Sequence, residues 1–236
     1  MSRDPASPQN ERPPATFVIV PVKRLSEAKS RLAPLLSENE RRQFCLAMLK
    51  DVLKAVRNTE DIHRAVVVSK DPHVLQVAKK CSTYPLEESR SGLNQAISEA
   101  INWCISMTAR GVLILPADIP LISAQDLSKI LRFGKDLSMV ICPSRSGDGT
   151  NALFLNPPQA AMTFYGRRSF QRYIKEASKG RISYYVYRSP RIALDIDTME
   201  DLSDFVAMKA EKTHASKFLM KLSIIRRLSF ARSSSN

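Results

Sequence analysis

The chain has 236 residues, of which 44% are hydrophobic and 25% charged, a composition that excludes a fibrous, collagenous or membrane-spanning protein and suits one globular domain. Its net charge of +13 predicts an anionic partner, such as a nucleotide, a phosphorylated metabolite, a nucleic acid or a membrane surface. The four cysteines form no CxxC pair, so no zinc or thioredoxin-like motif is expected. The polar, proline-rich residues 1–15 have no secretory apolar stretch, so we expect a disordered start and a cytoplasmic protein.

Strands and helices alternate along the rest of the chain. The expected strands cover 17–22, 64–69, 83–86, 111–116, 137–144, 151–156 and 182–188. The expected helices begin at a Ser37–Glu40 capping box, at Asp71-Pro72, at residue 91, at Ser123 with Asp126, near residue 167 and at Thr198 with Asp201. Apolar strands without alternation, separated by helices, predict an α/β fold with a mixed, mostly parallel sheet and helices on both faces. Ligands of such sheets bind beyond the carboxyl ends of the strands.

The loop after the first strand is rich in basic residues, and three of them, Lys23, Lys29 and Arg31, are candidate phosphate ligands. Lysine and arginine form short, charge-assisted hydrogen bonds with phosphate oxygens, so this loop is a candidate for gripping a triphosphate. The chain has no GxGxxG after this strand and no GxxxxGK[ST], so neither a dinucleotide fingerprint nor a P-loop is predicted. The alternative is a solvated charged loop that binds nothing.

A glycine turn with an amide residue, SGLN, opens the helix at residue 91. Gly92 would permit close approach of a base or ribose, and Asn94 could form hydrogen bonds with it. The alternative is an ordinary helix start.

Three aspartates follow apolar segments. Asp118 comes directly after the strand 111–116, and a carboxylate there is a candidate Mg²⁺ ligand, although it could simply be a turn residue. Asp195 and Asp197 are two residues apart in LDIDT, so in an extended strand both side chains lie on one face and Ile196 points to the core. Paired carboxylates repel unless a cation lies between them, so removing one charge is expected to leave the metal-free protein at least as stable. The alternative is that Asp197 caps the following helix.

Two further segments offer hydrogen-bond donors for an anionic second substrate. Thr150 lies at the entrance of a strand, and Gly166 and Ser169 lie at a helix start beside two arginines. Backbone N–H groups, hydroxyls and guanidinium groups together suit a phosphorylated acid. The alternative for Ser169 is helix capping.

The tail, residues 209–236, is basic and has apolar residues at helical spacing: Phe218, Leu219, Leu222, Ile225 and Leu228. This pattern is typical of an amphipathic helix that binds weakly to an anionic membrane or a partner protein, or that packs on its own domain. We expect the tail to be dispensable for chemistry.

Five segments in order resemble the CofC-type guanylyltransferases, which make the phosphodiester-linked side chain of the deazaflavin coenzyme F-420. They are PVKRLSEAKSRLAPLLSENERR, SGLNQAI, LPADIPLI, DGTNALFL and RSPRIALDIDTMEDL, and they span roughly residues 17–206. The resemblance implies one Rossmann-like, GT-A-type nucleotidyltransferase domain over 16–208, with the tail outside it.

The resemblance also implies roles for individual residues. The implied catalytic residues are Lys23, Lys29 and Asp118. The implied ligands are Asp118, Asp195 and Asp197 for Mg²⁺; Thr150, Gly166 and Ser169 for the phosphoacid; Lys23, Lys29 and Arg31 for the triphosphate; and Gly92 with Asn94 for the nucleoside.

The implied reaction moves GMP from GTP to the phosphate of 2-phospho-L-lactate, phosphoenolpyruvate or 3-phospho-D-glycerate and releases pyrophosphate. A transferase that joins the product to the deazaflavin would act next, a homodimer is compatible with an enzyme of this kind, and no stable nucleic-acid complex is expected. Two alternatives stay open. One is a sugar-phosphate nucleotidyltransferase or glycosyltransferase of the same fold. The other is a non-catalytic protein that binds nucleic acid or membrane surfaces through its charge.

Overall fold

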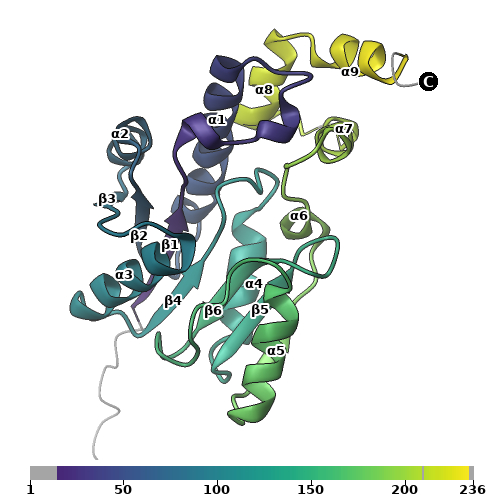
Figure 1. Cartoon of the computed structure of the whole chain (residues 1–236). Helices are drawn as coiled ribbons and strands as arrows, with labels where there is room; N and C mark the ends of the chain where they lie inside the picture. Colours follow the sequence, from purple (N-terminus) through teal and green to yellow (C-terminus); the bar gives the residue numbers. More distant parts are fainter. Residues whose placement is uncertain (1–14, 209, 234–236) are drawn as a thin grey trace, which may run out of the picture.

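The computed structural model describes residues 15–208 and 210–233 (Figure 1). The expectation of a disordered N-terminal segment therefore lies almost wholly outside the described residues. No helix in the described ranges is long and apolar enough to cross a membrane.

The described chain contains one seven-stranded sheet with the order β3-β2-β1-β4-β6-β5-β7. The strands are β1 (Thr16–Pro21), β2 (Ile62–Ser69), β3 (Tyr84–Glu87), β4 (Gly111–Ile114), β5 (Met139–Pro143), β6 (Thr150–Leu155) and β7 (Tyr184–Val186). Neighbouring strands are parallel except where β6 pairs with β4 and β5. The prediction of a mixed, mostly parallel sheet is confirmed.

The helices cover both faces of the sheet and so bury two separate apolar layers. They are α1 (Glu38–Arg57), α2 (Pro72–Lys80), α3 (Leu93–Ser106), α4 (Ala124–Phe133), α5 (Ser169–Lys179), α6 (Pro190–Ala193), α7 (Met199–Ala207), α8 (His214–Lys221) and α9 (Ile224–Ser233). One layer includes Phe44 of α1, and the other includes Tyr173 of α5. This arrangement leaves the loops at the carboxyl edge of the sheet free to form a site.

Local capping signals give the correct starts of four helices. Reciprocal capping boxes form between Ser37 and Glu40 at α1, between Ser123 and Asp126 at α4, and between Thr198 and Asp201 at α7. Asp71 caps α2, whose first residue is Pro72. These signals involve residues close in sequence, which is why the sequence alone is sufficient to read them.

The LDIDT segment is not a strand, which corrects the expectation from its spacing. Residues 190–193 form the short helix α6, and the chain then runs without regular structure to the cap of α7. Ile196 is fully buried as expected, and its N–H donates to the carbonyl of Asp118 at 3.0 Å. This bond, rather than a shared strand face, fixes Asp195 and Asp197 beside Asp118.

The tail packs on the domain. Helix α8 lies beside α1, and α9 continues from α8 over α7 (Figure 1). Leu219 and Leu228 are buried in the apolar layer that includes Phe44 of α1. The expected single helix is instead broken at Ser223, whose φ is 52°. The break shifts the helical register, so Ile224 is buried whereas Ile225, expected on the apolar face, is 66% exposed.

Two charged contacts attach the tail to α1. The buried carboxylate of Asp51 accepts hydrogen bonds from the N–H groups of His214 and Ala215, at 2.7 and 2.8 Å, and so caps α8. The guanidinium of Arg227 donates to both carboxylate oxygens of Glu40 at 2.9 Å and also to the carbonyl of Leu35. The second contact ties α9 to the end of the basic loop.

The Arg227–Glu40 pair predicts a pH-dependent contribution to stability. Hydrogen bonds from Arg227 lower the pKa of Glu40 from 4.5 to about 2, against the opposing effect of burial. A lowered pKa means that the pair stabilises the fold above about pH 4.5 and loses this effect as the pH falls towards 2. We expect Arg227→Gln to reduce the free energy of unfolding by about 1 kcal/mol near pH 7, because the pair is partly solvated.

Urea unfolding at several pH values measures this effect. The difference between Arg227→Gln and the unmodified chain should shrink steadily below about pH 4. Lys221→Gln, at an exposed position of α8, is the matched control and should be neutral. A difference that stays constant with pH would show that Arg227 acts through packing alone.

Candidate active site

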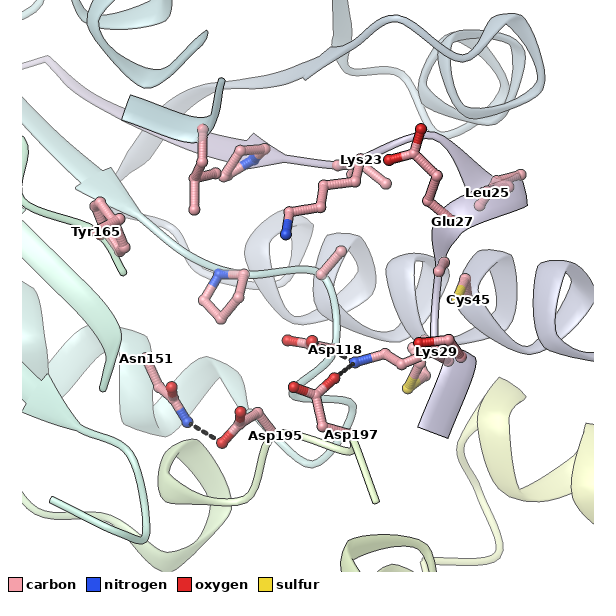
Figure 2. Close-up of a pocket in the computed structure, with 18 of the residues that line it drawn as sticks. Lys23, Leu25, Glu27, Lys29, Cys45, Asp118, Asn151, Tyr165, Asp195 and Asp197 are labelled. Atoms are coloured by element: carbon pink, nitrogen blue, oxygen red, sulfur yellow. Dashed lines mark hydrogen bonds and ion pairs between the residues drawn. The ribbon is translucent and has the colours of Figure 1, made fainter. Parts of the chain in front are cut away.

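A cavity of about 470 Å³ opens at the carboxyl ends of β1 and β4. Its walls come from the loop after β1, the turn after β4, the start of β6 and the segment between α6 and α7 (Figure 2). Parallel strands present their loops at this edge, so the location agrees with the sequence-based expectation. The predicted site residues that line the cavity are Lys23, Lys29, Arg31, Asp118, Thr150, Asp195 and Asp197.

Lys29 bridges two of the three aspartates. Its Nζ lies 2.5 Å from Oδ2 of Asp118 and 2.6 Å from Oδ1 of Asp197 (Figure 2). The lysine has a φ of 54°, in the left-handed region, and lies between the 3₁₀ turns Leu25–Glu27 and Ser30–Leu32. Its side chain is only 7% exposed, so its charge requires these carboxylate partners.

The bridging contacts shift the pKa values of Lys29 and Asp197. Burial alone would lower the pKa of Lys29, but the charges of Asp118 and Asp197 outweigh it and raise that pKa. Burial alone would raise the pKa of Asp197, but the charge and hydrogen bond of Lys29 outweigh it and lower that pKa. The repulsion expected from the sequence is therefore offset within the protein, and a gain in stability on removing one aspartate charge does not follow.

Asp195 is held by Asn151 rather than by Lys29. The Asn151 Nδ2 donates to Oδ1 of Asp195 at 3.0 Å and also to the carbonyls of Ile192 and Ala193. Burial raises the pKa of Asp195, the Asn151 hydrogen bond opposes this rise, and the negative charge of Asp118 adds to it. A carboxylate in this position gains stability when a cation binds beside it.

The three carboxylates fit a hard divalent cation, although they are not yet arranged as a metal site. Within residues 15–208 and 210–233, no cluster of three histidine, cysteine, aspartate or glutamate side chains is positioned to hold a metal. Lys29 stands between two of the aspartates instead. However, Oδ1 of Asp118 is buried and has no hydrogen-bond partner in the described chain, which is unusual for a carboxylate oxygen. An unsatisfied carboxylate oxygen beside two further carboxylates is a donor set that Mg²⁺ prefers.

Two other basic residues face the cavity with solvated side chains. Lys23 and Arg31 are exposed, and Lys23 extends into the cavity from the loop above the aspartates (Figure 2).

Gly92 caps α3 with a φ of 121°, a conformation that favours glycine, and it lines a second, smaller cavity next to the first.

The side-chain amide of Asn94 forms two hydrogen bonds with the main chain of Tyr165. Its Nδ2 donates to the carbonyl of Tyr165 at 2.9 Å, and its Oδ1 accepts from the N–H of Tyr165 at 2.8 Å. Both ends of the amide are thus used to fix the loop before α5. A direct contact of Asn94 with a nucleoside stays a prediction, and it would require one of these bonds to break.

The three residues expected to hold a phosphoacid lie close together. Ser169 Oγ donates to Thr150 Oγ1 at 3.0 Å, and the Ser169 N–H donates to the carbonyl of Gly166. Thr150 faces the cavity, Ser169 is buried behind it, and Gly166 is exposed with a φ of 125°. The alternative that Ser169 caps α5 is wrong, because Arg168 occupies the cap position.

The CofC-like guanylyl transferase family model matches residues 16–236. The chain belongs to this family. The 2-phospho-L-lactate guanylyltransferase of Methanocaldococcus vulcanius is 38% identical over 209 residues, covering 88% of this chain and 91% of the relative. The enzyme with the same name from Methanothermobacter thermautotrophicus is 39% identical over 208 residues, with the same coverage.

Solved structures confirm the fold. A cytidylyltransferase from Leptospira borgpetersenii has a TM-score of 0.58 at 14% identity and covers 92% of this chain and 95% of its own. The 4-diphosphocytidyl-2C-methyl-D-erythritol synthase of Anaerococcus prevotii has a TM-score of 0.60 at 10% identity and covers 88% and 96%. The chain is therefore a nucleotidyltransferase of the CofC-like family with a single α/β domain. The family match also includes the tail, which the sequence motifs had left outside.

Tyr165 is a cavity residue that the sequence analysis missed. Its hydroxyl is buried and has no hydrogen-bond partner among the described residues, and burial raises its pKa well above the ordinary value. The sequence offered one signal for Tyr165, namely that it directly precedes Gly166, a predicted site residue. The sequence could not show the direction of the ring, because the backbone contacts with Asn94 that orient this loop span 71 residues.

Proposed function

We propose that the protein transfers GMP from GTP to the phosphate of a small phosphorylated acid. The observation that carries this proposal is the meeting of Asp118, Asp195 and Asp197 on one wall of a cavity that Lys23 also enters (Figure 2). A site that binds a triphosphate with its metal counter-ion needs carboxylates, which bind the metal ion, and basic side chains, which bind the phosphate oxygens. The names of the relatives favour 2-phospho-L-lactate as the acid, and phosphoenolpyruvate and 3-phospho-D-glycerate are the other candidates.

In the proposed reaction, a phosphate oxygen of the acid attacks the α-phosphorus of GTP in line. The bond from the α-phosphorus to the bridging oxygen breaks, and pyrophosphate leaves with the electron pair. The nucleophile is already anionic, so no general base is needed, which fits a cavity lined by no histidine among the described residues. The protein therefore acts by positioning the substrates and neutralising their charge.

The proposed cofactor is Mg²⁺, held by Asp118, Asp195 and Asp197. When bound, Mg²⁺ neutralises phosphate charge and polarises the phosphoryl group that is attacked. Lys29 holds the carboxylates of Asp118 and Asp197 close together. Lys23 and Arg31 bind the remaining phosphate oxygens.

Thr150, Gly166 and Ser169 are proposed to hold the acid, and Gly92 the nucleoside. The product joins the acid and guanosine through a diphosphate, and a transferase that attaches it to a deazaflavin is the proposed next enzyme. A homodimer and a weak contact of the basic tail with an anionic membrane or a partner protein are further proposals.

Product analysis by mass spectrometry tests the reaction. The protein is incubated with Mg²⁺, one nucleoside triphosphate and one acceptor, drawn from the three phosphoacids and a panel of sugar phosphates. We expect a guanylylated phosphoacid and stoichiometric pyrophosphate. Transfer only to sugar phosphates would establish the sugar-phosphate alternative. Salt-sensitive binding to nucleic acid or anionic vesicles without any turnover would establish the non-catalytic alternative.

Replacing Ser169 with alanine is expected to raise the KM for the acid more than the KM for GTP. The Ser169 hydroxyl orients Thr150, the group that faces the cavity. Loss of one neutral hydrogen bond costs about 1 kcal/mol, or about a five-fold rise. Ser128→Ala, at an exposed position of α4 outside both cavities, is the control. Steady-state kinetics with each substrate varied would contradict the assignment if both KM values rose equally.

A further inference from the structure

A second cavity of about 250 Å³ adjoins the first at the ends of β1 and β2. The two share the wall formed by Pro21, Val22, Lys23, Glu27 and Leu93. An elongated ligand could thus occupy both, with its anionic part among the aspartates and basic residues. The rest of the ligand would then lie in the smaller cavity.

The smaller cavity has the character of a site for a flat heterocycle. Its wall combines the apolar side chains of Val22, Val68, Leu93 and Ala96 with polar side chains, and polar groups in such a pocket fix the orientation of a bound base. The polar side chains are those of Lys23, Arg24, Glu27, Lys70, Glu88 and Ser91. One is the carboxylate of Glu88, whose Oε1 accepts a hydrogen bond from the N–H of Gly92 at 3.2 Å.

Hydrogen bonds fix both the main chain and the side chain of Glu88. Its N–H donates to the carbonyl of Ser69 at the end of β2, and Gly92 donates to its carboxylate. The carboxylate is therefore placed before any ligand binds. Lys70 lines the same cavity, and its Nζ donates to the Ser91 hydroxyl at 2.7 Å, so the cavity wall includes a cation as well.

We propose that the second cavity holds the guanine base of GTP and that Glu88 determines specificity for it. This inference rests on the proposed function. Guanine presents two neighbouring donors, N1–H and the 2-amino group, which match the two oxygens of one carboxylate. It presents the O6 acceptor beside them, which matches Lys70. Adenine presents an acceptor at N1, which cannot bond to the Glu88 carboxylate, and a donor at its 6-amino group, which cannot bond to the Lys70 ammonium.

Glu27 is the competing carboxylate. It lines both cavities and lies beside Lys23 in the 3₁₀ turn after β1 (Figure 2). Its place at the junction of the cavities suits a contact near the ribose or phosphates. Glu88 lines only the smaller cavity, which makes it the residue for the base.

Calorimetric titration of the full chain with the Mg²⁺ complexes of GTP, ITP and ATP tests the inference without any acid present. ITP lacks the 2-amino group, so it reports on one of the two proposed hydrogen bonds. The variant is Glu88→Gln, which keeps the shape and the acceptor for Gly92. Glu87→Gln is the matched control, because Glu87 is exposed and lines neither cavity.

We expect the unmodified chain and Glu87→Gln to prefer GTP to ITP by about ten-fold, and ATP to bind more weakly than either. Glu88→Gln should weaken GTP binding by about 10- to 100-fold and ITP binding less, so the GTP preference collapses. An unchanged ratio of GTP to ITP affinity in Glu88→Gln, or a collapse in Glu27→Gln instead, would overturn the inference.

The proposed base site and the proposed reaction can be refuted independently of each other. A chain that binds GTP in a Glu88-dependent way but guanylylates no phosphoacid upholds the base site and refutes the proposed reaction. A chain that guanylylates a phosphoacid with a GTP preference independent of Glu88 does the opposite.

Discussion

Replacing Asp118 or Asp197 with asparagine is expected to lower guanylyl transfer by about a thousand-fold or more. Each substitution keeps the shape of the side chain and removes a charge that pairs with Lys29 and that we propose also holds Mg²⁺. Loss of one preorganised electrostatic contact commonly reduces turnover by about 10²- to 10³-fold, and here two contacts are lost together. Pyrophosphate release under saturating substrates is the measurement.

The same variants should also weaken the metal-free fold. Lys29 is almost completely buried, so each asparagine leaves its charge with one carboxylate partner instead of two. We expect a loss of about 1 to 3 kcal/mol for Asp118→Asn, and less for Asp197→Asn because the Asp197 side chain is half exposed. This reverses the direction that carboxylate repulsion alone predicts.

A readout independent of turnover is the melting temperature. Mg²⁺ with GTP should raise the melting temperature of the unmodified chain more than either ligand alone, and Asp118→Asn should lose the part that depends on Mg²⁺. Asp204→Asn is the control, because Asp204 is exposed and pairs with Arg145 outside the cavity. Turnover within ten-fold of the unmodified enzyme in both variants would refute the carboxylate site.

Deleting residues 212–236 is expected to unfold the protein or leave it only marginally stable. Leu219, Ile224 and Leu228 are buried in the same apolar layer as Phe44, and the ring of Phe44 stacks on Phe218 at 6.3 Å. Burial of each large side chain contributes about 1.5–3 kcal/mol, so three of them contribute about 6 kcal/mol. That amount approaches the whole net stability of a typical domain, about 5–15 kcal/mol. The expectation that the tail is dispensable for chemistry stays a prediction, whereas the buried contacts indicate that the tail contributes to the stability of the fold.

A point substitution distinguishes the loss of buried contacts from the effect of shortening the chain. Leu219→Ala should lower the free energy of unfolding by about 2–5 kcal/mol, because it opens a cavity between α1 and α8. Ile225→Ala, also in the tail but 66% exposed, should change it by less than about 0.5 kcal/mol. Urea unfolding measures both. Equal effects in the two variants, or a truncated chain with an unchanged melting temperature, would show that the tail is only loosely attached.

The sequence by itself determined the fold class, the starts of four helices and the three aspartates that meet at the cavity. Caps such as Ser37 with Glu40 act over three residues, and apolar strands such as 17–22 reveal burial on both faces, so these signals are local. The aspartates stood out because each follows an apolar segment.

Only the tertiary structure decided how those residues are partnered. Lys29 meets Asp118 across 89 positions and Asp197 across 168, and Asp51 caps α8 across 163. No spacing rule reaches that far, because such contacts depend on how the strands and helices pack. The break at Ser223, beyond which Ile224 is buried and Ile225 is exposed, is likewise a feature that the helical spacing of the apolar residues did not show. The sequence thus supplied the charged groups, and the fold decided that a buried lysine lies between two of them.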